Sequence, residues 1–192
     1  MIDSAEATRL IYQHAGSATV IPTMTALRLW RALGLRLERD FPLVGAMGKA
    51  SSLGLGVALA QPQHKVIILD GDGSLLNNLG TLVTIGNMSP PNLYHFVYQD
   101  GVYTTTGGQP IPGAHIVRFA DMARAAGYRS AYDFSDLEAF ASELPRILAQ
   151  QGPVLVCLRV RHPPTLPPLA VGQIDRKKAI RQVRQTLTGR PA

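Results

Sequence analysis

The chain has 192 residues, of which 46% are hydrophobic and 17% charged, a composition typical of a globular domain and not of a disordered chain. Its formal net charge of +6 is concentrated between residues 176 and 190, where no acid and no aromatic residue occurs, so a solvated helix or a contact with an acidic partner is favoured over nucleic-acid binding. No apolar run reaches the roughly 20 residues of a membrane helix and no signal peptide is evident, so we expect no membrane association.

Helix and strand patterns alternate along the first half of the chain. Asp3 and Glu6 are a capping pair for a first helix. The apolar run 66–69 does not alternate in polarity, as expected of a strand buried on both faces of a parallel sheet. Beyond the first helix we predict, in chain order, a strand at 19–22, a short helix at 27–33, a helix at 49–60, a strand at 66–69 and a helix at 75–88.

The alternation continues in the second half. We predict a strand at 93–98, a helix at 118–126, an extended segment at 128–133, a helix to Gln150 capped by Ser135 and Glu138, and a strand at 154–160. Cys157 lies in this last strand, where a buried thiol and a reducing, cytoplasmic setting are expected. We therefore predict a three-layer α/β/α domain with a mostly parallel sheet over residues 1–162, followed by a proline-rich linker and a basic helix over 163–192.

Two predicted strands end on an acid beside glycine. Asp72 stands between Gly71 and Gly73, and Asp100 precedes Gly101. The carboxyl ends of parallel strands meet at one edge of a sheet, and hard carboxylate oxygens suit a magnesium ion that holds a phosphate group. The glycines allow backbone amides to approach that phosphate, and the helix expected from Leu75 points its positive end at it.

A dinucleotide-binding loop is the main alternative for this turn. Its fingerprint would read G-x-G-x-x-G, but the sequence 71–76 is GDGSLL and has no third glycine. The acid at Asp72 would also repel a phosphate unless a cation lay between them. The pattern therefore indicates a diphosphate cofactor that is held through a metal.

The wider sequence resembles the thiamine diphosphate enzymes. Within them, it is most similar to the phosphonopyruvate and sulfopyruvate decarboxylases, over about residues 5 to 160. The segments that carry this resemblance are Leu55-Gly56, Pro62, GDGSLL at 71–76, NLGTL at 78–82, YTTTGGQ at 103–109 and GAMGKASS at 45–52.

The resemblance assigns roles by position. It implies that Asp72, Asp100 and the backbone carbonyl of Val102 ligate magnesium, in a chain that has Gln99-Asp100 where most of the family has asparagine at the second turn. Cofactor contacts are implied for Gly71, Gly73, Ser74 and Thr105 at the diphosphate, and for Gly45 and Met47 at the aminopyrimidine. Met47 is also implied to wedge the cofactor into its bent form, although a plain core methionine would fit the same pattern.

A second group of polar residues follows the strand at 93–98. Thr104, Thr105, Thr106 and Gln109 offer donors for an acidic substrate group, while an ordinary surface turn explains them equally well. His115 is expected to be exposed, and His95, inside a strand, to be a core residue.

The resemblance further implies decarboxylation of an acidic 2-oxo acid, such as sulfopyruvate or phosphonopyruvate, to an aldehyde and carbon dioxide. The family's activating glutamate lies on a separate pyrimidine-binding domain, and residues 1–40 are too short to form one. We therefore expect a hetero-oligomer in which a partner subunit supplies that glutamate, so that no catalytic residue is assigned in this chain. A split carboligase of the acetolactate-synthase kind and a non-catalytic cofactor-binding protein remain as alternatives.

Overall fold

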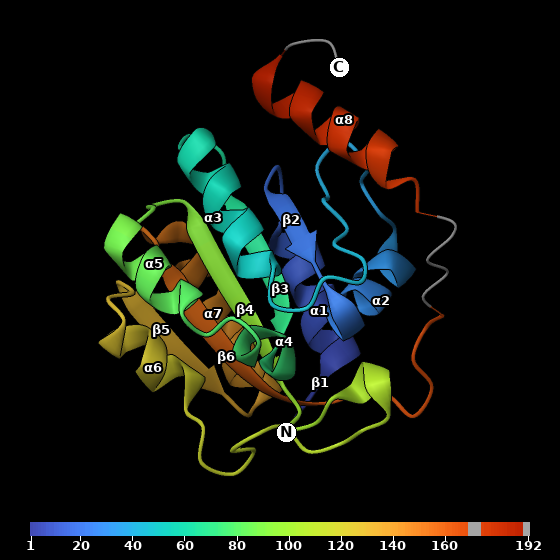
Figure 1. Ribbon diagram of the computed structural model, residues 1–192, viewed down its shortest axis with the longest axis vertical. Coiled ribbons are helices and arrows are strands. Elements are labelled where there is room, and N and C mark those ends of the chain that lie inside the picture. The colour runs from blue at the N-terminus through green and yellow to red at the C-terminus, as the bar shows by residue number, and fades with distance from the viewer. Residues whose placement is uncertain (169–173, 190–192) are drawn as a thin grey trace.

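The computed structural model describes residues 1–168 and 174–189, without the side chain of Arg176. Within these residues the strands are β1 (Ile2–Asp3), β2 (Thr19–Pro22), β3 (Val66–Gly71), β4 (Leu93–Gln99), β5 (Ser130–Phe134) and β6 (Val154–Arg161). They form one sheet in the order β1-β6-β4-β3-β2, with β5 also paired to β6, and every pairing is parallel (Figure 1). Because β5 pairs with residues 154–158 and β1 with 160–161, these two edge strands lie end to end along β6.

Helices cover both faces of the sheet. They are α1 (Ser4–His14), α2 (Met24–Leu33), α3 (Ala50–Ala60), α4 (Asp72–Leu76), α5 (Thr81–Met88), α6 (Phe119–Ala125), α7 (Leu137–Ala149) and α8 (Arg176–Thr188), with a 3-10 turn at Thr104–Thr106. One core cluster joins the sheet to α1, α2 and α7, and the other joins it to α3, α5 and α6. The predicted three-layer α/β/α fold is therefore confirmed.

Strand β3 shows why both faces must be covered. Its side chains alternate between the two clusters, with Ile67 and Leu69 on the α1 side and Val66 and Ile68 on the α3 side, and all four are fully buried. A run that is apolar at every position is thus the expected pattern for this strand.

The prediction of one helix over 75–88 is wrong in two respects. The segment forms two helices, α4 and α5, with a turn at residues 77–80 between them, and the first helix begins at Asp72 rather than at Leu75. Asparagine and glycine are poor helix formers, and the Asn78 side chain instead donates to the carbonyl of Gly48, with Nδ2 2.9 Å from the oxygen. With only five residues, α4 adds little helix dipole at this edge of the sheet.

The two capping predictions have different outcomes. Asp3 caps α1 by accepting from the amides of Ala5 and Glu6, but Glu6 pairs with Arg9. The cap of α7 is Asp136 and not Ser135, because the Asp136 carboxylate accepts from the amide of Ala139 at 2.9 Å. Strand β1 is a further difference, since two residues carry no readable strand pattern.

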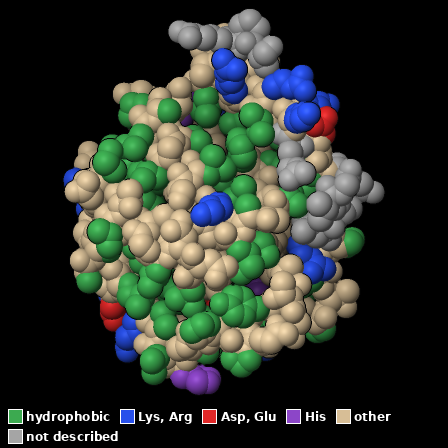
Figure 2. Space-filling model, viewed as in Figure 1, with side chains coloured by type: hydrophobic (Ala, Val, Ile, Leu, Met, Phe, Trp, Pro, Cys, Tyr) green, Lys and Arg blue, Asp and Glu red, His purple; other side chains and the backbone are tan. Residues whose placement is uncertain are grey.

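The linker and the terminal helix follow β6. Arg28 on α2 donates to the carbonyls of Leu166 and Pro167, which holds the described part of the linker; residues 169–173 lie outside the described residues. Helix α8 buries Ala179 and Val183, and its basic side chains gather at one end of the molecule (Figures 1 and 2). In the part of the chain that is described, no helix combines the length and apolar character needed to cross a bilayer.

Candidate functional site

The two acid–glycine turns meet at the carboxyl edge of the sheet, as predicted. Strands β3 and β4 are paired up to Gly71 and Tyr98, so the segments that follow the two strands leave the sheet side by side. Asp72 accepts from the amide of Gly73 through Oδ1 at 2.7 Å and from the amide of Gly101 through Oδ2 at 2.8 Å. The Asp72 side chain thereby ties the first turn to the second.

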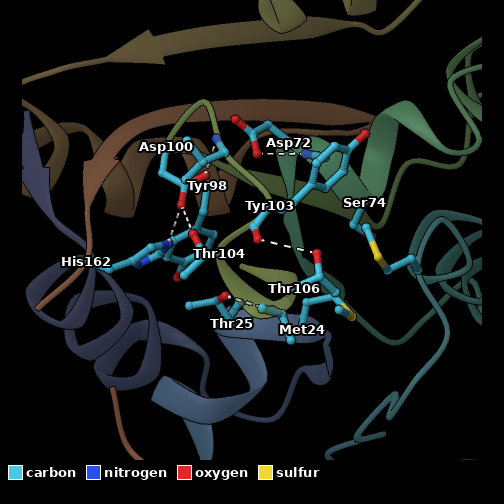
Figure 3. A pocket seen from close by; sticks show the side chains of 16 residues that line it. Met24, Thr25, Asp72, Ser74, Tyr98, Asp100, Tyr103, Thr104, Thr106 and His162 are labelled. Atoms are coloured by element: carbon cyan, nitrogen blue, oxygen red, sulfur yellow. Dashed lines mark hydrogen bonds and ion pairs between the residues drawn. The ribbon is translucent and has the colours of Figure 1, made fainter. Parts of the chain in front are cut away.

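Asp100 lies in the same pocket and is held mainly through one oxygen. Its Oδ2 accepts a hydrogen bond from the Thr104 hydroxyl and lies 3.1 Å from Nε2 of His162 (Figure 3). Its Oδ1 receives a longer bond of 3.3 Å from the amide of Val102. The second turn therefore presents a carboxylate whose orientation is set by neighbours from two different segments.

The electrostatics of the two acids differ. Burial, together with the negative charge of Asp100, raises the pKa of Asp72 to about 6 despite its two backbone hydrogen bonds. Burial would also raise the pKa of Asp100, but the hydrogen bonds from His162 and Thr104 outweigh it and hold that pKa below its usual value. The negative charge that Asp100 places beside the buried Asp72 is an arrangement that a cation would stabilise.

The donor set fits a hard divalent cation bound together with an oxygen-rich ligand. Over the described residues, no group of three or more His, Cys, Asp or Glu side chains could hold a metal by itself. Two carboxylates and a backbone carbonyl at Val102 leave coordination positions that diphosphate oxygens or water would fill. Only glycine fits at position 73, since a Cβ there would come within 2.6 Å of the Tyr103 ring.

Most of the predicted site residues line one pocket. Those that do are Met47, Gly71, Asp72, Gly73, Ser74, Asp100, Val102, Thr104, Thr105 and Thr106. Gly45 and Gln109 are exposed and do not line it. The Gly73 amide, expected at the diphosphate, instead donates to Asp72 at 2.7 Å.

Ser74 connects this pocket to the segment that carries Met47. The Ser74 Oγ accepts from the amide of Gly48 at 3.1 Å, so its own hydrogen is left to donate to a ligand. Gly48 has a φ of +72°, and a Cβ there would come within 3.1 Å of Asn77. The bond from Asn78 to the Gly48 carbonyl and the close packing of Asn77 thus hold this segment in place.

Some pocket residues were missed by the sequence analysis. Met24, Thr25 and Ala26 line the pocket at the start of α2, Tyr98 and Tyr103 line it from the β4 side, and His162 lines it just after β6. Met24 has a φ of +49°, a strained value for a residue with a side chain. Met24 and His162 each follow a predicted strand closely, so extending the strand-end rule to 19–22 and 154–160 would have found them.

The histidine expectations hold. His95 is fully buried, and His115 is exposed on a neighbouring surface beside Asp100 rather than in this pocket.

Comparison with known families matches residues 22–158 to the C-terminal TPP binding domain of thiamine pyrophosphate enzymes. Phosphonopyruvate decarboxylase of Streptomyces viridochromogenes is 39% identical over 81% of this chain and 38% of its own length. Sulfopyruvate decarboxylase subunit beta of Methanocaldococcus jannaschii is 40% identical over 59% of this chain and 60% of its own length. The chain thus spans less than two thirds of these relatives.

Solved structures give the same fold. A Mycobacterium smegmatis chain described as a thiamin diphosphate-dependent enzyme superposes with a TM-score of 0.70 at 19% identity, over 85% of this chain and 32% of that one. The sequence match runs from the last residue of β2 into β6 and includes both acid–glycine turns, and the fold agrees. The chain therefore belongs to the family of C-terminal TPP-binding domains of thiamine pyrophosphate enzymes.

Proposed function

We propose that this chain is the diphosphate- and magnesium-binding subunit of a two-subunit, thiamine diphosphate-dependent decarboxylase of acidic 2-oxo acids. One observation carries the proposal. Asp72 and Asp100 come from neighbouring parallel strands, share a pocket and are joined through the Gly101 amide, which is 2.8 Å from Asp72 Oδ2.

In this proposal Asp72, Asp100 and the Val102 carbonyl hold Mg²⁺. Ser74, through its free hydroxyl hydrogen, donates to the diphosphate, and Gly71 and Gly73 line the pocket without side chains that would block that group. Thiamine diphosphate, when bound, supplies the carbon nucleophile and the electron sink for loss of carbon dioxide. The chain's own contribution would be to bind and orient the diphosphate end, with Met47 and Gly45 as the residues that would contact the pyrimidine.

We assign the substrate's acidic group to the loop that follows β4. Thr105 and Thr106 are exposed at the pocket, where the Thr105 hydroxyl lies 3.4 Å from the Thr25 hydroxyl and the Thr106 hydroxyl makes a long 3.4 Å bond to the carbonyl of Tyr103 that a substrate would replace. Gln109 lies on the same loop. The relatives named phosphonopyruvate decarboxylase and sulfopyruvate decarboxylase subunit beta support a phosphonate or sulfonate as that group. Hydroxyl and amide donors suit either one.

A partner subunit is proposed for two reasons. Among the described residues that line the pocket there is no glutamate, so the activating acid expected from the family would come from elsewhere. Helices α3 and α5 also expose apolar side chains, with Leu59 43%, Val83 63% and Met88 47% exposed (Figure 2). Exposed apolar surface of this kind is typical of a protein–protein interface.

The proposal is tested by reconstitution. The chain, the product of the adjacent reading frame, and their mixture are each supplied with Mg²⁺, thiamine diphosphate, and phosphonopyruvate, sulfopyruvate or pyruvate. We expect carbon dioxide and the aldehyde from the mixture only, with an acidic substrate preferred. Turnover by the chain alone would refute the two-subunit arrangement, and acetolactate from pyruvate would favour the carboligase alternative.

A further inference from the structure

The pocket contains a line of polar contacts that reaches from its rim to the N-terminal helix. His162 Nε2 lies 3.1 Å from Asp100 Oδ2, and His162 Nδ1 lies 2.8 Å from the hydroxyl of Ser4. Ser4 is fully buried at the start of α1, and His162 is 11% exposed (Figure 3 shows the His162 end). The imidazole is therefore held at both ring nitrogens.

Parallel pairing places the ring. Strand β1 pairs with the end of β6 through Ile2–Val160 and Asp3–Arg161. Ser4 follows β1 by one residue and His162 follows β6 by one residue, so the two side chains lie next to each other. The register of β1 against β6 thus fixes the contact between Ser4 and His162.

The contacts distinguish the two oxygens of Asp100. A carboxylate only accepts, so His162 Nε2 is the donor, and the Thr104 hydroxyl donates to the same Oδ2. Among the described contacts, Oδ1 receives only the 3.3 Å bond from the Val102 amide. Oδ2 is therefore committed to the protein, and Oδ1 is the oxygen left for a cation.

We propose that His162 is a positioning residue for the metal site: it holds Asp100 through Oδ2 so that Oδ1 faces a divalent cation bound with a diphosphate. This inference rests on the proposed function of Asp100 as a ligand. Partners that orient a metal ligand typically alter metal affinity 10- to 100-fold when removed. A histidine anchored by Ser4 would supply this orientation from outside the two acid–glycine turns.

Three variants separate positioning from packing. In His162→Gln the amide nitrogen takes the place of Nε2 and still reaches Asp100, whereas in His162→Asn it takes the place of Nδ1 and reaches only Ser4. His162→Ala removes both contacts. His14→Gln, at an exposed histidine on α1, is the matched control.

The experiment measures Mn²⁺ binding in the presence of thiamine diphosphate. Binding is monitored as the decrease of the free Mn²⁺ signal in electron paramagnetic resonance. Mn²⁺ substitutes for Mg²⁺ at oxygen sites. We expect the half-saturating Mn²⁺ concentration to rise about 10-fold in His162→Ala and His162→Asn, and less than about 3-fold in His162→Gln and in the control. In an Asp100→Asn background, adding His162→Ala should change it by less than about 2-fold, because the oriented carboxylate is gone.

Each other outcome is informative. If the wild-type chain, alone and with its partner, shows no binding of Mn²⁺ with thiamine diphosphate, the proposed function fails and this inference with it. If the wild type binds but His162→Ala and His162→Asn bind equally well or better, only the positioning role is overturned. A lower melting temperature with unchanged Mn²⁺ saturation would likewise overturn it and make His162 a packing residue.

Discussion

Two histidine–aspartate pairs lie among the residues that the structure describes, and they differ in burial, distance and hydrogen-bond partners. At the pocket, His162 and Asp100 are 3.1 Å apart, partly accessible, and bonded to Ser4 and Thr104. Inside the sheet, His95 on β4 and Asp70 on β3 are 3.6 Å apart and fully buried. Asp70 Oδ2 and His95 Nε2 face each other with no hydrogen-bond partner among the described atoms.

The contrast shows that position along a strand, not residue type, separates site from core. Asp70 and Asp72 are two residues apart, yet Asp70 is still paired in the β3–β4 ladder while Asp72 lies just past its end. A side chain within the ladder is enclosed by the helical layer, and one beyond it opens to the edge where ligands bind. The following experiments test this contrast.

The largest effect is expected for Asp72→Asn. Loss of a ligand charge at the strand end should weaken Mg²⁺-dependent binding of thiamine diphosphate more than about 100-fold, as measured by isothermal titration calorimetry. Asp121→Asn, which changes an exposed acid on α6, is the control and should bind normally. Equal affinity of the two variants would place the metal elsewhere.

The core pair should respond in stability rather than in binding. His95→Leu leaves the Asp70 carboxylate buried without its neighbour, so we expect the free energy of unfolding to fall by about 3 kcal/mol in urea denaturation. Cofactor affinity at saturating Mg²⁺ should stay within about 2-fold. The double variant Asp70→Asn/His95→Leu should recover part of the loss, because a buried amide costs less than a buried carboxylate. A large change in affinity with little change in stability would contradict a core role.

A pair of glycines sharpens the comparison at the edge itself. Gly73→Ala should push the Tyr103 ring, 2.6 Å from the new Cβ, and weaken cofactor binding about 10-fold. Gly80→Ala, where nothing lies within 4 Å of the Cβ, should leave binding unchanged and stabilise the chain by up to about 1 kcal/mol. Thermal melting and calorimetry of both variants check this. Similar affinities would mean that close backbone approach at Gly73 is not needed.

The last experiment is expected to show no reaction of the Cys157 thiol with thiol reagents in the folded chain. The thiol is fully buried on β6 and donates to Gln99 Oε1 at 3.0 Å, and burial raises the pKa of Cys157 well above its usual value. At pH 8 the folded chain should therefore not react with iodoacetamide over hours, while the chain in guanidinium should react fully. Rapid labelling of the folded chain would show that the sheet interior opens.

The sequence allows the sheet, its layers and the two acid–glycine turns to be predicted, because these depend on local patterns. The apolar run of β3 and the glycines around Asp72 are signals of this kind. Contacts between distant segments carry no such signal: Ser4 and His162 are 158 positions apart. The division of 75–88 into two helices was missed for the same reason, since Asn78 leaves the helix to bond Gly48 across 30 positions. Which strand-end residues share one pocket depends on strand order, and the sequence does not state that order.

The N-terminal strand has a practical consequence for handling the protein. Because β1 pairs with the end of β6, Met1 lies at the same end of the molecule as the pocket, and it is 76% exposed. Helix α8 lies at the opposite end (Figure 1). A purification tag fused ahead of Met1 would therefore lie at the pocket's end of the molecule, where its histidines would compete for the metal ions under study. A tag placed after α8 would keep those measurements clean.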